Sequence, residues 1–275
     1  MEGKVFLRTL KVDAKRAFRL PFLLAVVAVI AGFVFDNYGA LVNALFISPD
    51  IAHDVTSVFY FYFNAVAFGG AFTRYLFAMI AALPFAAQYA TERQSGMTPY
   101  LISRTGRREY CFSKMIISAL SGGLALFVGS LIFIVILSTR LQLIITSDLV
   151  EHQWIPYYEL LISGGGIPYF AIVLFLMFLT GMLWGALACG ISAFVTDTYV
   201  VIASSFLLCF LQIQISRLLR LPNNARLEML LYGRGQWGNA GVSLLFLGIL
   251  ILLIIAGCTF LFTHKVVRRG QDGLS

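Results

Sequence analysis

The sequence predicts an all-α membrane protein with six transmembrane helices and an N-terminal amphipathic interfacial helix. Hydrophobic residues make up 60% of the 275 positions and charged residues only 12%, about half the charged share of a soluble domain. Each crossing of a roughly 30 Å hydrocarbon layer takes about 20 residues. Six crossings and their connections therefore fill the chain, and we expect no separately folded ATPase or catalytic domain.

The positions of the basic residues predict the orientation. Of the twenty Lys and Arg, six lie in residues 1–19, five in 93–114 and three in 265–269. Basic segments beside spans stay on the cytoplasmic side, where they also contact anionic head groups. We therefore expect both termini in the cytoplasm and membrane lipids as partners. The net charge of +7 is attributed to these segments, so we expect no nucleic acid.

Residues 1–19 are predicted to form the interfacial helix. Its basic side chains recur every three or four positions and share one face: Lys4, Arg8, Lys11, Lys15 and Arg19. The apolar side chains form the other face, which we expect to rest on the membrane: Phe6, Leu7, Leu10, Ala14, Ala17 and Phe18. A cleavable signal peptide is the alternative, but the basic region is long and no convincing small-x-small site follows.

The predicted transmembrane domain covers residues 20–264 and precedes a cytoplasmic tail at 265–275. Its spans are expected at about 20–41, 72–90, 111–139, 169–194, 199–216 and 242–263. An inner coupling loop is expected at 91–110. Outer segments are expected at 42–70, 140–167 and 217–241, and a re-entrant or interfacial turn is predicted just before the fourth span.

Two apolar runs, 55–73 and 75–91, compete for the second span. If both crossed, the five basic residues of 93–114 would lie outside, which the positive-inside rule disfavours. The aromatic and β-branched run at 55–63 is therefore assigned to a partly buried outer or interfacial segment. The four arginines of the last outer segment fit this topology poorly, and we predict a solvated or lipid-facing loop for them: Arg217, Arg220, Arg226 and Arg234.

The spans also disfavour several classes of function. Ionisable residues in mid-membrane mark ion and proton pathways, and the interiors of the last four predicted spans contain none. A proton- or sodium-coupled carrier is therefore disfavoured. No P-loop, zinc spacing, disulfide framework or catalytic triad pattern occurs. Gly122, Gly181 and Gly185 indicate close helix packing instead. We expect no enzyme activity, no metal and no cofactor in this chain, with energy supplied by another subunit.

The inner loop carries a pattern of charges around a short apolar stretch. A Glu-Arg pair ends the second predicted span, and Gly, an apolar stretch, an Arg-rich turn and a Lys follow. These positions are Glu92, Arg93, Gly96, Leu101, Arg104, Arg107, Arg108 and Lys114. The pattern resembles the intracellular loop of type-2 ABC exporter permeases, and the interfacial helix and six spans extend the resemblance over nearly the whole chain. Met97 and Pro99 depart from it, and they indicate a short coupling helix beginning near Pro99.

The resemblance implies the type-2 ABC exporter fold and a permease subunit in a bacterial plasma membrane. ABC ATPase subunits, which would bind ATP and Mg, are the implied partners, together with a second copy of the permease or a paralogue. Within the loop, Tyr100, Leu101 and Ile102 are expected to enter an apolar groove of the ATPase. The charged residues of the loop are expected to pair with charges around that groove: Glu92, Arg93, Arg104, Arg107 and Arg108. Glu92 is also expected to hold the basic turn formed by Arg104, Arg107 and Arg108.

Uncharged spans favour an amphipathic or hydrophobic cargo such as a peptide, a drug or a lipid-like molecule. A different class of function is compatible with the same sequence. The chain could be a non-transporting membrane sensor, or an immunity subunit that sequesters a toxin. Binding and release of a partner ATPase in the presence of ATP would separate the two hypotheses.

Overall fold

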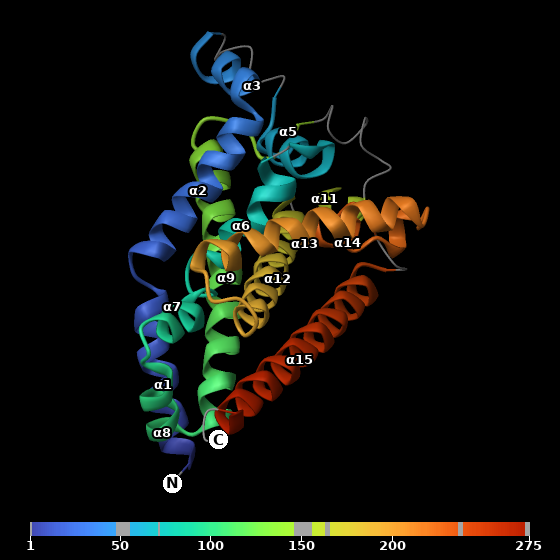
Figure 1. The fold of residues 1–275 in the computed structure, drawn as a ribbon. Helices are drawn as coiled ribbons and strands as arrows, with labels where there is room; N and C mark the ends of the chain where they lie inside the picture. Colours follow the sequence, from blue (N-terminus) through green and yellow to red (C-terminus); the bar gives the residue numbers. More distant parts are fainter. Residues whose placement is uncertain are drawn as a thin grey trace.

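The computed structural model describes residues 2–47, 56–70, 72–145, 156–162, 166–235 and 239–272. These residues form helices joined by turns and contain no strand, apart from an isolated bridge between Ser57 and Gln142 (Figure 1). Four helices are long and apolar enough to cross a membrane: α9 (Arg107–Ser138), α12 (Ile167–Ser192), α13 (Thr198–Leu218) and α15 (Ala240–Asp272). The prediction of an all-α protein with several apolar spans is confirmed.

The N-terminal helices form a bent pair that brings the number of candidate spans to five if the pair counts as one. Helix α1 (Glu2–Ala17) meets α2 (Leu20–Asp36) at 51°. The chain then breaks at Asn37, whose side-chain amide donates to the Phe33 and Phe61 carbonyls at 3.0 and 3.1 Å. Helix α2 therefore ends five residues before the predicted end of the first span, and α3 (Tyr38–Val42) follows.

The second predicted span, 72–90, is not one continuous helix. A π-helical turn η3 (Phe72–Leu76) leads into α6 (Phe77–Ala82), and a turn separates α6 from α7 (Gln88–Gln94). Pro84 lies in that turn and cannot continue a helix, since it lacks a backbone N–H and its ring clashes with the preceding turn. Helix α6 is a short buried element packed against α9, α12 and α13, so six full crossings are not seen.

The aromatic run at 55–63 forms no span in its described part. It forms the six-residue helix α5 (Val58–Phe63), and all but one of its side chains are buried. The Val58 and Phe59 amides donate to the carbonyls of Gln142 and Leu143, at 2.9 and 3.1 Å. Two segments predicted for the same side of the membrane are thus in contact. The remaining short elements are η1 (Asn43–Ile47), η2 (Asn64–Gly69), α11 (Tyr158–Ile162), η5 (Asn223–Ala225) and α14 (Leu227–Leu231).

Helices α9 and α12 pack through backbone contact at glycines. A Cβ at Gly122 would lie 2.6 Å from the Ala81 carbonyl oxygen and 2.7 Å from that of Gly181. A Cβ at Gly185 would lie 2.6 Å from the Ser118 carbonyl oxygen, which leaves no room for a side chain. The Ser118 hydroxyl donates to the Gly185 carbonyl at 2.8 Å. The predicted close packing at these glycines is confirmed.

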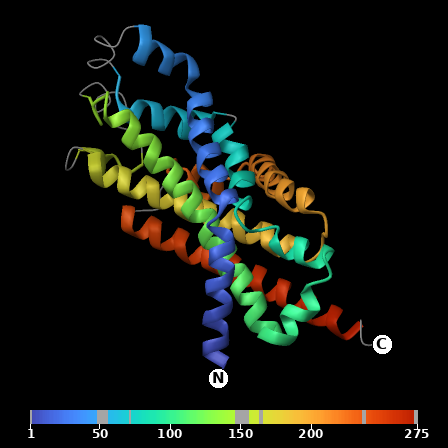
Figure 2. The ribbon, with the colours of Figure 1, turned by 90° about the vertical axis from the view of Figure 1, so that its left-hand side faces the viewer.

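Helices α9, α12 and α15 run at a similar slant, with α12 in contact with the other two (Figure 2). Helix α13 lies across this direction (Figure 1) and packs against α12 and α6. Helix α15 continues to Asp272, so the predicted tail at 265–275 is helical in its described part. The first turn of α1, helix α8 (Thr98–Thr105) and the end of α15 lie at one end of the molecule, and α3 at the other (Figure 1).

Candidate functional site

The predicted coupling loop is a compact helix–turn–helix rather than an open loop. Helix α7 ends in a Schellman motif, in which Gly96 N donates to the Arg93 carbonyl at 3.1 Å and Met97 N to the Glu92 carbonyl at 3.0 Å. Gly96 has φ +70°, a conformation that glycine adopts without strain. This turn reverses the chain into α8, which has Pro99 in its first turn. The predicted short helix near Pro99 is therefore present.

Helix α8 leads into α9 through a single residue. Gly106 has φ +88°, and α9 begins at Arg107. Arg107 and Arg108 therefore form the first turn of α9 and not the loose basic turn that the sequence predicts. Gly106 N donates to the Ile102 carbonyl at 2.9 Å, and the Gly106 carbonyl accepts from Tyr110 N at 3.1 Å, so the linking residue is hydrogen-bonded to both helices.

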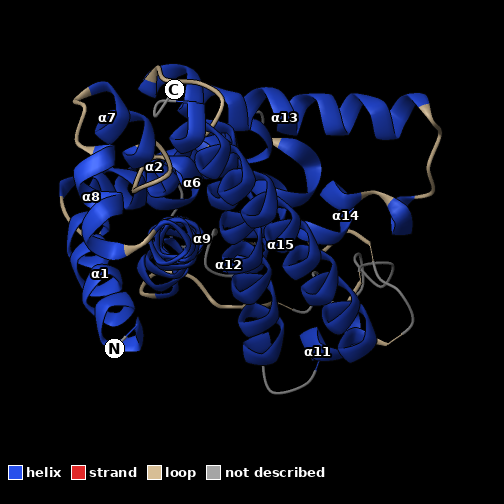
Figure 3. Ribbon diagram, turned by 60° about the horizontal axis from the view of Figure 1, so that its bottom comes forward, coloured by secondary structure: helices blue, strands red, loops and turns tan. Residues whose placement is uncertain are grey.

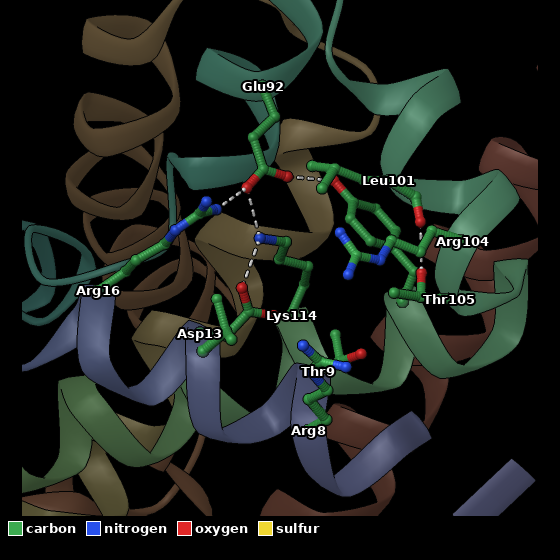
Figure 4. A pocket seen from close by; sticks show the side chains of 11 residues that line it. Arg8, Thr9, Asp13, Arg16, Glu92, Leu101, Arg104, Thr105 and Lys114 are labelled. Atoms are coloured by element: carbon green, nitrogen blue, oxygen red, sulfur yellow. Dashed lines mark hydrogen bonds and ion pairs between the residues drawn. The ribbon is translucent and has the colours of Figure 1, made fainter. Parts of the chain in front are cut away.

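Beside α8 lies a cluster of four charged side chains, three of which are buried (Figure 4). The Lys114 ammonium donates to Asp13 Oδ1 at 2.9 Å and to Glu92 Oε1 at 2.7 Å. Arg16 donates to the same Glu92 oxygen at 2.9 Å. Two positive and two negative charges are thus joined in one chain of ion pairs, which we call the charge cluster.

Neutral donors complete the hydrogen bonding of the two carboxylates. Ser113 Oγ donates to Asp13 Oδ2 at 2.7 Å. The Tyr110 hydroxyl donates to Glu92 Oε2, and Gln88 Nε2 donates to Glu92 Oε1 at 3.2 Å. Buried charges are tolerated when they are paired and hydrogen-bonded, and these bonds satisfy that condition.

Burial makes the charge cluster energetically important. Lys114 is 1% exposed and Asp13 and Glu92 are each 3% exposed. Only the Arg16 side chain reaches water, with 38% of its surface exposed. The cluster joins α1, α7 and α9, three segments that are far apart in the sequence. It therefore joins α1 and α7 to the start of α9, the first long helix of the bundle.

The expected partners of Glu92 were wrong. The sequence predicts that this carboxylate holds Arg104, Arg107 and Arg108, but its described contacts go to the charge cluster, Tyr110 and Gln88. A carboxylate on α7 can reach Lys114 because α7 packs beside the start of α9. Arg93 is partly buried on the neighbouring position of α7.

The predicted apolar plug is only partly outward-facing. Tyr100 is 79% exposed and Met97 is 52% exposed. Leu101 and Ile102 instead pack against the chain's own core around Tyr110. An amphipathic helix places successive side chains on different faces, so three adjacent residues could not all project to one partner. The exposed tip of α8 is therefore Tyr100 with Met97.

The basic face predicted for α1 is exposed in its described part: Arg8, Lys11, Lys15 and Arg19. The side chain of Lys4 lies outside the described residues. The apolar face is not reserved for lipid, because Leu10, Ala14 and Ala17 pack with Phe85 and Ile117. Helix α1 thus packs along α9 through part of its apolar face. Leu7 and Phe18, on the same predicted face, are exposed.

Sequence reasoning missed Asp13, Arg16 and Tyr110 as members of this site, and it gave Lys114 no charge partner. One signal was present. Asp13 stands in a segment with six basic residues, and it lies three positions from Arg16, on the same side of a helix. An isolated acid on a basic helix indicates an internal partner, but the sequence does not say which one.

A pocket of about 470 Å³ opens beside the charge cluster between α1, α8 and α9 (Figure 4). The side chains around it come from the middle and C-terminal turns of α1, from Glu92 on α7, from α8 and from the start of α9. They are Arg8, Thr9, Val12, Asp13, Arg16, Glu92, Leu101, Arg104, Thr105, Tyr110 and Lys114. Every charged member of the cluster thus borders the pocket.

The four arginines of the segment 217–241 divide into two groups. Arg217 and Arg220 are exposed, as predicted for a solvated or lipid-facing loop. Arg226 donates to the Leu221 carbonyl at 2.7 Å. Arg234 is partly buried, and burial lowers the pKa of its guanidinium from the ordinary value, with Arg74 lowering it further and Glu228 raising it.

Comparison with family models, with curated proteins and with solved structures found no match to this chain. The resemblance to type-2 ABC exporter permeases therefore rests on the sequence pattern alone. Within the described ranges, no group of three or more His, Cys, Asp or Glu side chains could hold a metal ion. The chemistry of the site is that of ion pairs and hydrogen bonds among side chains of α1, α7 and α9.

Proposed function

We propose that this chain is the permease subunit of an ATP-driven exporter and that separate ATPase subunits supply its energy. The observation that carries the proposal is that α8 exposes one face and packs the other against the chain's own core. Its tip, Tyr100, is 79% exposed, and its other face rests on the chain's own core and beside the charge cluster. A small helix that is free on one side and fixed on the other is suited to receive a mechanical stroke.

The long helices offer a path for that stroke. Helix α9 is continuous over 32 residues and begins one residue after α8. It packs against α12 through the glycine contacts at Gly122 and Gly185, where backbones touch. Tightly packed interiors shift between arrangements rather than deform continuously. Rotation of α8 would therefore move α9 and α12 together.

Two further observations support the proposed membrane arrangement: the exposed apolar surface of the long helices and the position of the two ends of the described chain. Helices α2, α13 and α15 expose large apolar side chains along much of their length, a surface for lipid or for a second copy or paralogue. Both ends of the described chain lie beside α8 (Figure 1), which supports an arrangement with the termini and α8 in the cytoplasm of a bacterial cell. The cargo we propose is amphipathic or hydrophobic.

The test is co-purification of an ATPase with the native complex, followed by measurement of substrate-stimulated ATP turnover. Tyr100→Ala should lower both by roughly tenfold or more, because exposed tyrosines that become buried in an interface dominate its binding energy. Tyr38→Ala is the matched control: Tyr38 is 67% exposed and lies at the opposite end of the molecule (Figure 1).

Equal binding and turnover for both variants would refute a coupling role for α8. If the native complex contains no ATPase and the chain protects cells from a toxin without ATP turnover, the sensor or immunity function takes its place.

A further inference from the structure

The pocket beside the charge cluster has an excess of positive charge. Four basic and two acidic side chains border it. The acidic ones, Asp13 and Glu92, are both occupied by Lys114 and Arg16 within the charge cluster. Two positive charges therefore remain without a carboxylate, and they belong to Arg8 on α1 and Arg104 on α8.

These two guanidinium groups come from opposite walls. In Figure 4 both point into the space between α1 and α8. Within the described part of the chain, neither Arg8 nor Arg104 forms an ion pair. Two cations that face a shared space repel each other, and a bound anion would convert this repulsion into two favourable contacts.

The shape of the guanidinium groups and the apolar side chains of the pocket indicate what kind of anion would bind: a phosphate next to an apolar portion. A guanidinium presents paired N–H donors that match two oxygens of a phosphate. Val12 and Leu101 also border the pocket, so an apolar portion next to the phosphate would find contact. Helices α1 and α2 together form one candidate membrane-crossing pair. Arg8 lies near the N-terminal end of that pair, where a phospholipid head group would lie if the pair crosses the membrane.

We propose that the pocket between α1 and α8 binds a phosphate group through Arg8 and Arg104. The phosphate is that of an anionic phospholipid head group or free phosphate. Its binding joins α8 to α1 through the ligand, beside the charge cluster. The site needs no ATPase and does not depend on the proposed transport function.

The experiment measures binding to the purified full-length chain in a zwitterionic detergent. Three probes are titrated separately: phosphatidylglycerol, phosphatidylcholine and inorganic phosphate, with native mass spectrometry for the lipids and calorimetry for phosphate. The variant is Arg8→Gln with Arg104→Gln. The matched control is Arg19→Gln with Arg108→Gln, which removes the same charge from exposed positions outside the pocket lining.

Wild type and control should bind phosphatidylglycerol or phosphate with similar affinity, and the pocket variant should bind at least about tenfold more weakly, through loss of two charge-assisted contacts. Preference for phosphatidylglycerol identifies a lipid head group, and binding of inorganic phosphate alone identifies free phosphate. Equal losses in variant and control would mean attraction to general surface charge and would overturn the site. Wild type that binds neither probe, or binds phosphatidylcholine equally well, would also overturn it. Unchanged thermal unfolding of the variant shows that its fold is intact.

Discussion

Replacing Lys114 by Met removes the central cation of the charge cluster while keeping a long side chain. Lys114 is 1% exposed and contacts both carboxylates, at 2.9 and 2.7 Å. After the substitution, Glu92 keeps Arg16, Tyr110 and Gln88 as partners. Asp13 keeps only Ser113 among its described contacts. The loss of stability should therefore come mainly from the Asp13 carboxylate, which is left buried without a positively charged partner.

The size of the effect follows from burial. Breaking a buried ion pair by removing one partner costs about 3–5 kcal/mol, whereas replacing both partners is often close to neutral. We therefore expect Lys114→Met to lower the free energy of unfolding by about 3–5 kcal/mol. Adding Asp13→Asn should restore about 2–3 kcal/mol of this loss, because no buried charge is then left without a counter-ion.

The assay is equilibrium unfolding in mixed micelles with increasing dodecyl sulfate, followed by circular dichroism. Lys11→Met is the control, since Lys11 is exposed on the same helix as Asp13, and it should stay within about 0.5 kcal/mol of wild type. The reasoning fails if Lys114→Met unfolds like the control. It also fails if Asp13→Asn destabilises the Lys114→Met variant further instead of rescuing it.

Two other predictions concern the helix packing and the topology. Gly181→Ala should lower the free energy of unfolding by about 1–3 kcal/mol through overpacking, because a Cβ there would overlap the Gly122 backbone. The control Gly257→Ala should be neutral or stabilising, because its Cβ meets open space. Equal effects of the two substitutions would contradict the α9–α12 contact. In a background without the native cysteines, Ser95→Cys should react with an impermeant thiol reagent only from the cytoplasmic side and Arg140→Cys only from outside. Labelling of both from one side would contradict the topology.

The positions of most long helices followed from local sequence. Helix α12 begins at Ile167 and α13 at Thr198, each within a few residues of the prediction, because an apolar run flanked by turn residues is a local signal. The Asp197 side chain accepts from the Tyr199 and Val200 amides at 2.8 and 3.1 Å, a cap that fixes the start of α13. Pro84 in the sequence also indicated a helix break. The second span was nevertheless predicted as continuous because only its hydropathy was considered.

The interior of the candidate site could not be predicted in the same way. Glu92 and Arg16 are 76 positions apart, and Lys114 and Asp13 are 101 positions apart. Such partners are chosen by the packing of α1 against α9, and the charge pattern of the loop offered three arginines as nearer candidates. Proximity in the sequence suggested those arginines as partners of Glu92. In the folded chain, Glu92 is buried and pairs instead with Arg16 and Lys114, which the packing of α1 and α9 brings next to it.

By itself, the sequence predicted a helical chain with several apolar segments long enough to cross a membrane and a short helix between charged turns, because composition, apolar run length and turn residues act locally. Only the tertiary structure decided that α8 turns Leu101 and Ile102 inward, that α13 lies across the bundle (Figure 3), and that Lys114 sits between two carboxylates. The physical reason is that a buried charge or apolar side chain takes its partner from whichever segment packs against it. That packing is a property of the whole fold.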